Sequence, residues 1–394
     1  MPTASFLPSD KRIPHSIGLS LSGGGFRATL FHLGAIRRLN EFGITTKLTT
    51  VSSVSGGSIL NGFLASRLDP PLSAGVADYE NSVSQPMRGF CALDIRRWIA
   101  LEKLPWMHNS VALGKEYDQH LTLGKKLAQI SPAPAHIFCS TDLAYGVNWI
   151  FRRGLCGDYQ AGYMPTPEDW PVSTAVAASS CFPPVFKPLE LDLDPAKLSG
   201  GKDCSPGREQ RIREMTFSDG GVYDNLGLEP IWKNHETVLV SDGGALFSIG
   251  GDSGAVWEIG RFVAIPENQA LAVRKRWLIS SFNSGQLKGT YWGIGTTVAE
   301  YKLPGGYSEQ LVKNFICTIR TDLDSFSEGE ACVLENHGYL LADAAIRAWV
   351  PGLLPAQLPP LNIPHPPWMD EAKVREALKT SSKRSLLGRS QAAG

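Results

Sequence analysis

The apolar and polar positions near the start of the chain alternate between strand and helix patterns. Ile17 to Leu21 is a short apolar run typical of a buried strand, and from Phe26 to Leu39 apolar residues recur at helical spacing. Leu48 to Val51 predicts a second, β-branched strand, and Ile59 to Leu68 a second helix. This strand–helix–strand–helix order is the building block of a parallel sheet, so we predict an α/β fold.

The turns that follow these two strands are rich in glycine. The first reads Ser22-Gly23-Gly24-Gly25-Phe26-Arg27, and the second reads Ser53-Val54-Ser55-Gly56-Gly57. Carboxyl ends of parallel strands meet at one edge of a sheet, so we expect the two turns to lie close together. Consecutive glycines that open a helix point free N–H groups at an anion, and a serine on a sharp strand-to-helix turn presents its hydroxyl. Acyl-transfer chemistry needs both features side by side.

Two other interpretations of these turns are available. Gly23-x-Gly25-x-x-Ala28 fits a loose dinucleotide-binding fingerprint, but that fingerprint expects an acidic residue after the second strand, where Ser52 and Ser53 stand. Ser55 alone is more often the cap of the helix that follows it. The glycine triplet one strand earlier favours the catalytic interpretation.

A serine nucleophile needs a base, and two aspartates compete for that role. Further strand patterns lie at 136–139, 215–218 and 238–241. Asp219-Gly220-Gly221 follows the second of these, and a near copy, Asp242-Gly243-Gly244, follows the third. Their positions by themselves do not choose between the two carboxylates.

The histidines leave a three-residue alternative open. The order Ser55, Asp219 and then His235 or His337 is compatible with the triad of an α/β-hydrolase. A lone histidine is more often a packing or capping residue.

Composition narrows the class of protein. Lysines plus arginines number 38, as do aspartates plus glutamates. The chain therefore lacks the excess of positive charge that is typical of nucleic-acid-binding proteins. Its seven cysteines are scattered, which indicates free thiols in a reducing compartment. No signal peptide, spanning segment or metal-ligand spacing is recognisable, so we expect a cytoplasmic protein without metal or other cofactor.

The chain divides into three predicted parts. Residues 1–14 are an N-terminal extension, 15–350 are one catalytic domain, and 351–394 are a Pro-rich and basic tail with one possible helix at 370–379. Lys379, Lys383 and Arg384 offer contact with anionic headgroups, although a solvated tail is the more common case.

Together the motifs resemble the patatin-like phospholipase family. The segment 22–28 is similar to that family's oxyanion segment D-G-G-G-x-R-G, 53–57 to its nucleophile motif, and 219–221 to its D-G-[GA] aspartate motif. The stretch 175–186 is similar to a further family signature. As an ordered set from about residue 15 to 245, these motifs are far more specific than any one of them.

The resemblance implies a three-layer α/β fold, with a mostly parallel central sheet flanked by helices in one domain. It also implies a lipid acyl hydrolase, phospholipase A-like or lysophospholipase-like, that works through a Ser–Asp dyad and an acyl-enzyme. By position, Ser55 is the nucleophile and Asp219 the base, which decides against Asp242. The implied oxyanion hole is Gly23, Gly24 and Gly25, and the supporting motif positions are Arg27, Ser53, Gly57, Gly220 and Gly221.

The chain departs from the family pattern at small residues. Ser22 and Ala28 stand where the family often has aspartate and glycine, and Ser53 replaces the first glycine of the elbow. Acyl transfer on the same dyad, a Ser-Asp-His esterase and a non-catalytic lipid-binding scaffold remain alternatives. The substrate is expected to be a lipid or acyl ester met at a membrane surface, with head group, chain length and oligomeric state left open.

Overall fold

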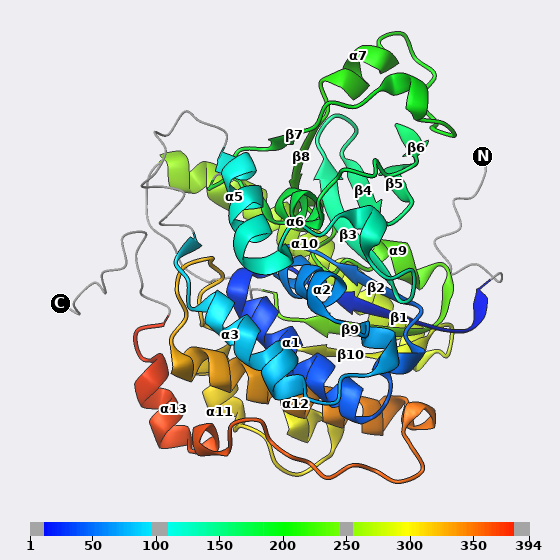
Figure 1. Cartoon of the computed structure of the whole chain (residues 1–394). Helices are drawn as coiled ribbons and strands as arrows, with labels where there is room; N and C mark the ends of the chain where they lie inside the picture. Colours follow the sequence, from blue (N-terminus) through cyan, green and yellow to red (C-terminus); the bar gives the residue numbers. More distant parts are fainter. Residues whose placement is uncertain (1–11, 96–108, 184, 245–254, 382–394) are drawn as a thin grey trace.

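The structure, a computed structural model, describes residues 12–95, 109–183, 185–244 and 255–381. These residues form a ten-stranded sheet flanked by helices (Figure 1). The strands are β1 Ile13–Leu21, β2 Thr50–Ser53, β3 Ala135–Asp142, β4 Val147–Arg152, β5 Leu155–Asp158, β6 Gly162–Met164, β7 Leu189–Glu190, β8 Thr216–Asp219, β9 His235–Asp242 and β10 Lys288–Gly293. The helices are α1 Gly25–Glu41, α2 Gly56–Arg67, α3 Gln85–Cys91, α5 Asn109–Tyr117, α6 Val172–Ser180, α7 Arg208–Arg213, α8 Gly221–Asp224, α9 Glu229–Trp232, α10 Ala255–Asn283, α11 Glu309–Leu311, α12 Glu328–Trp349 and α13 Glu371–Leu378.

The sheet has a parallel part and an antiparallel part. Its order is β10-β9-β1-β2-β3-β4-β5-β6, and the pairs from β10 to β3 are all parallel. β4, β5 and β6 continue the sheet as antiparallel hairpins, and β8 pairs antiparallel with β3 on the side of β2, beyond the end of β2. The predicted α/β fold with a mostly parallel central sheet is confirmed. The sequence patterns did not identify β4 to β6 or β10.

Different helices cover the two faces of the sheet. In β9, Val238 and Val240 pack in a cluster with Ile231 of α9 and Leu278 of α10. Leu239, between them, belongs to the larger cluster that α1, α2 and α12 form on the opposite face. Successive side chains of a strand point to opposite faces, so a strand covered on both faces is apolar throughout. The result is the predicted three-layer arrangement.

Helices α1 and α12 approach each other closely on that second face. A Cβ on Gly34 would lie 1.8 Å from the carbonyl oxygen of Glu335, and a Cβ on Gly338 would lie 1.8 Å from that of Phe31. Glycine at both positions lets the two backbones touch. This contact fixes α1, whose first turn carries the glycine triplet.

Residues 351–381 lie along α12. The ring of His365 is 2.8 Å from a carboxylate oxygen of Glu335, and Val374 and Leu378 of α13 are buried. Lys379 directly follows α13, whereas Lys383 and Arg384 lie outside the described residues. The division of the chain at residues 14 and 350 stays a prediction. In the described ranges, no helix is long and apolar enough to cross a membrane.

Candidate functional site

The first glycine turn connects β1 to α1 in a conformation that needs glycine. Gly24 has φ 138° and Gly25 has φ 55°, in the region that side chains disfavour. The N–H of Gly23 donates a hydrogen bond of 2.9 Å to the carbonyl of Asn225. Within the described part of the chain, the N–H groups of Gly24 and Gly25 have no acceptor. These two donors at the positive end of α1 are therefore available to an anion.

Ser55 occupies the elbow between β2 and α2. Its φ of 49° and ψ of −117° are a strained conformation for a residue with a side chain, at a typical cost of about 1–3 kcal/mol. Its hydroxyl makes no capping hydrogen bond to α2, so the capping interpretation of this serine is wrong. Hydrogen bonds to other segments hold the elbow: among them, the Ser55 N–H donates to the carbonyl of Ser179, and the Gly57 N–H donates to that of Ser22.

A chain of hydroxyls beneath the elbow explains the serine at position 53. Asn61 donates to the Ser53 hydroxyl at 2.9 Å, and this hydroxyl lies 2.9 Å from that of Ser58. Ser58 in turn lies 2.8 Å from the Ser179 hydroxyl, which accepts a bond from the Ser55 N–H at 3.0 Å. The side chain that replaces the family's glycine is thus fully hydrogen-bonded, and it braces the elbow.

Asp219 reaches the same edge of the sheet from the opposite direction. It ends β8, which runs antiparallel to β3 with Asp219 opposite Ser140. On the same side of β3, Phe138 is opposite Ser53 of β2. The carboxyl end of β8 therefore stops two residues beyond the level at which β2 ends.

One carbonyl oxygen joins the two motifs. The Ser179 oxygen accepts the Ser55 N–H at 3.0 Å and the Gly220 N–H at 3.2 Å. The Asp219 carboxylate accepts the Gly221 N–H at 2.7 Å, and its side chain is buried. The structure thus brings the backbones of the two motifs together, although Ser55 and Asp219 are 164 residues apart in the sequence.

Asp242, the competing aspartate, is held in a different environment. Its carboxylate forms an ion pair with Lys275, accepts the Tyr291 hydroxyl at 2.7 Å and accepts the Gly244 N–H at 2.9 Å. Burial acts to raise the pKa of Asp242, but the charge of Lys275 and the hydrogen bonds from Lys275, Tyr291 and Gly244 together outweigh it, so the pKa lies below its ordinary value. The carboxylate of Asp242 is therefore already paired with the ammonium group of Lys275 on α10.

The two histidines of the triad alternative have structural partners. His235 stands at the amino end of β9, away from the turns, and its ring binds the Ile231 carbonyl and the Thr50 hydroxyl. His337 of α12 donates to the Ile294 carbonyl at 2.9 Å, and burial lowers its pKa to about 4. Both rings serve packing in this structure.

Arg27, in the first turn of α1, donates hydrogen bonds to segments distant in the chain. Its buried guanidinium donates to the carbonyls of Gly243 at 3.2 Å, Ile319 at 2.8 Å and Cys317 at 3.2 Å. Burial lowers its pKa to about 10. Arg27 therefore ties α1 to two distant segments.

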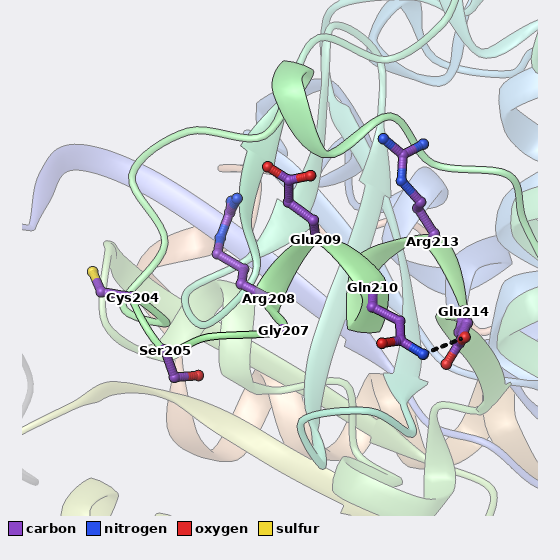
Figure 2. A pocket seen from close by; sticks show the side chains of 8 residues that line it. All are labelled: Cys204, Ser205, Gly207, Arg208, Glu209, Gln210, Arg213 and Glu214. Atoms are coloured by element: carbon purple, nitrogen blue, oxygen red, sulfur yellow. Dashed lines mark hydrogen bonds between the residues drawn. The ribbon is translucent and has the colours of Figure 1, made fainter.

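An open hollow of about 680 Å³ lies elsewhere, around α7 (Figure 2). Side chains of both charges line it, and Gln210 donates to Glu214 at 3.0 Å across part of it. None of the predicted site residues contributes to it; its lining is Cys204, Ser205, Gly207, Arg208, Glu209, Gln210, Arg213 and Glu214. In the described ranges, no group of three or more His, Cys, Asp or Glu side chains could hold a metal ion.

Two residues of the site, Ser179 and Asn225, were missed by the sequence patterns. Ser179 lies inside the stretch 175–186, which resembles a family signature, and Asn225 follows the Asp219-Gly220-Gly221 motif by four positions. Proximity to the motifs was the available signal. The hydrogen bonds that join Ser179 to Ser55 and Asn225 to Gly23 link residues distant in the sequence, so the sequence patterns do not reveal them.

One comparison with known proteins covers the part of the chain that holds the motifs. A family model, patatin-like phospholipase, matches residues 19–232, which is just over half of the chain. Among solved structures, the chain is similar to human GIVD cytosolic phospholipase A2 in complex with methyl gamma-linolenyl fluorophosphonate, at 13% identity and a TM-score of 0.46, over 93% of this chain and 59% of that chain. It is also similar to VipD from Legionella pneumophila, at 13% identity and a TM-score of 0.36, over 85% and 67% of the two chains. The chain thus spans less than two thirds of the phospholipase A2 chain, and no curated protein matches it in sequence.

Proposed function

Since this chain belongs to the patatin-like phospholipase family, we propose that it hydrolyses carboxylic ester bonds of lipids, with Ser55 as nucleophile and Asp219 as base. The observation that carries the proposal is the Ser179 carbonyl, which accepts N–H groups from both motifs. A nucleophile and a base must lie within reach of each other, and this shared acceptor holds their backbones together.

The proposed reaction has two halves. Asp219 takes the proton of the Ser55 hydroxyl while the serine oxygen attacks the ester carbonyl, and it then gives that proton to the leaving alcohol. Water, activated by Asp219, then attacks the acyl-enzyme and releases the fatty acid.

The glycine turn is proposed to stabilise the oxyanion in both halves. In the oxyanion hole of Gly23, Gly24 and Gly25, donation falls to Gly24 and Gly25, because Asn225 already accepts the N–H of Gly23. One such donor typically contributes about 3–4 kcal/mol to lowering the barrier.

Exposed apolar side chains beside the dyad support a lipid substrate and peripheral contact with a membrane. Phe182 directly follows Cys181, whose carbonyl accepts the Asp219 N–H, and Val222 directly follows Gly221. Phe182 is 45% exposed and Val222 43% exposed. Apolar surface next to a reactive centre favours acyl chains over polar substrates.

The direct test is hydrolysis of a chromogenic acyl ester and of phospholipid vesicles by Ser55→Ala and Asp219→Asn. Each change is expected to lower kcat by at least about 10³-fold without loss of fold, as judged by circular dichroism. A fluorophosphonate probe is expected to label the native protein at Ser55 and to leave Ser55→Ala unlabelled.

Matched variants separate this proposal from its competitors. Asp242→Asn changes the same Asp-Gly-Gly motif one strand away and should retain hydrolysis, as should His235→Gln and His337→Gln. Full activity of Asp219→Asn together with loss of activity in Asp242→Asn or in a histidine variant would refute the dyad.

A further inference from the structure

Asn225 lies where three glycine turns meet. A Cβ on Gly23 would lie 2.2 Å from the carboxamide oxygen of Asn225 and 3.1 Å from Cβ of Ser55. A Cβ on Gly221 would lie 2.7 Å from the same oxygen and 3.0 Å from a carboxylate oxygen of Asp219. The carboxamide therefore fills the space that the missing side chains leave between the proposed nucleophile and the proposed base.

The other side of the carboxamide faces the second Asp-Gly-Gly motif. A Cβ on Gly244 would lie 2.9 Å from the amide nitrogen of Asn225 and 2.8 Å from a carboxylate oxygen of Asp242. The Asn225 backbone takes part as well, since its carbonyl accepts the N–H of Gly23 at 2.9 Å. Side chain and main chain of this residue thus contact the glycine turn from two directions.

The neighbouring residue holds Asn225 in place. The buried carboxylate of Asp224 accepts the N–H groups of Leu226, Leu228 and Glu229 at 2.9–3.2 Å. Arg274 of α10 lies 3.5 Å from the same carboxylate. The backbone around Asn225 is consequently fixed before any substrate binds.

We propose that Asn225 is a positioning residue for ester hydrolysis, which sets the distance between the glycine turn, the Ser55 elbow and the Asp219 turn. The inference rests on the proposed function. It follows from two properties of this side chain: the carboxamide is large enough to keep the turns apart, and it carries no charge between two carboxylates. An alanine leaves the space empty and lets the turns approach, whereas an aspartate keeps the volume and adds a negative charge.

The experiment compares Asn225→Ala and Asn225→Asp with the native protein, using a soluble acyl ester. Asn225→Ala is expected to lower kcat by about 10²-fold with KM within about threefold, because misplacement of the reacting groups by about 1 Å has that effect. Its rate of labelling by the fluorophosphonate should fall in parallel. Asn225→Asp, which keeps the shape, should move the acid limb of the kcat/KM profile to higher pH.

The expected pH shift comes from repulsion between the new carboxylate at position 225 and the carboxylate of Asp219. Among the residues that the structure describes, the charged groups around position 225 are Asp219 on β8, Asp242 on β9, Asp224 on α8, and Lys275 and Arg274 on α10. A new carboxylate beside Asp219 disfavours its ionised form, which is the form that acts as base. The shift therefore tests whether position 225 lies beside the ionised base, and the loss of kcat without a change in KM in Asn225→Ala tests positioning.

Asn336→Ala is the matched control. Asn336 of α12 donates to the Tyr307 hydroxyl at 3.3 Å and to the His365 carbonyl at 2.9 Å, so its loss should lower Tm and leave kcat and the pH profile unchanged. The proposal is overturned if Asn225→Asp keeps the native pH profile, or if Asn225→Ala keeps the native kcat. Should Ser55→Ala remain active, the proposed function fails first, whatever the Asn225 variants do.

Discussion

Replacing Gly56 with alanine tests the contact between the two glycine turns. A Cβ at this position would lie 2.1 Å from the carbonyl oxygen of Gly25 and 2.9 Å from its nitrogen, whereas ordinary contacts begin at 3.4 Å. All of these atoms are backbone, so no side chain can turn aside. The elbow and the glycine turn must therefore separate by about 1 Å, in a densely packed region.

The expected effect is large on catalysis and moderate on stability. A displacement of about 1 Å between nucleophile and oxyanion donors corresponds to about 10²-fold in kcat, or about 2.7 kcal/mol of barrier. Overpacking of a buried site costs about 1–3 kcal/mol, which lowers Tm by several degrees for a chain of this size. The assay is kcat on a soluble acyl ester, referred to the fraction of folded protein that a fluorophosphonate titrates.

Gly89→Ala is the control for this prediction. Gly89 is inside α3, and a Cβ there would meet nothing within 4 Å. Alanine at such a helical position is expected to be neutral or to stabilise by about 0.5–1 kcal/mol, with native kcat. A Gly56→Ala protein with native kcat and native Tm would refute the predicted contact between the turns, and with it the placement of the donors beside Ser55.

Three further outcomes are expected from the packing around the site. Gly34→Ala should force α1 away from α12 and lower the free energy of unfolding by about 1–3 kcal/mol or more in urea titrations, because its Cβ would meet a carbonyl oxygen at 1.8 Å; an unchanged midpoint would contradict the close crossing. Arg27→Met should destabilise the protein by about 2–3 kcal/mol, because three carbonyls lose their donor; native urea stability would show that these bonds contribute nothing. His32, His136 and His337 have pKa values that burial lowers from 6.5 to about 4, so the unfolded chain binds protons in this window that the folded chain does not. Stability is therefore expected to fall as pH falls from 6.5 to 4, by about 2 kcal/mol per histidine at pH 5, and a Tm that stays constant from pH 7 to 5 would rule this out.

Local patterns in the sequence determined the framework of this protein. The strands that precede the two glycine turns, the helices that follow them and the parallel relation between the units are all encoded within about 50 residues, where hydrophobic period and glycine placement leave few alternatives. The identity of Ser55 as the residue on the elbow followed from the same patterns. The antiparallel hairpins β4 to β6 were not found, because strands of three to six residues carry too little periodicity to stand out.

Tertiary structure alone decided how the pieces meet. The direction of β8, the ion pair that occupies Asp242 and the acceptor that engages the Gly23 N–H all depend on partners distant in the chain. The contact between the Ser179 hydroxyl and the Ser55 N–H spans 124 positions. Hydrogen bonds act over about 3 Å regardless of sequence separation, so only the packed chain reveals which donor and acceptor are neighbours.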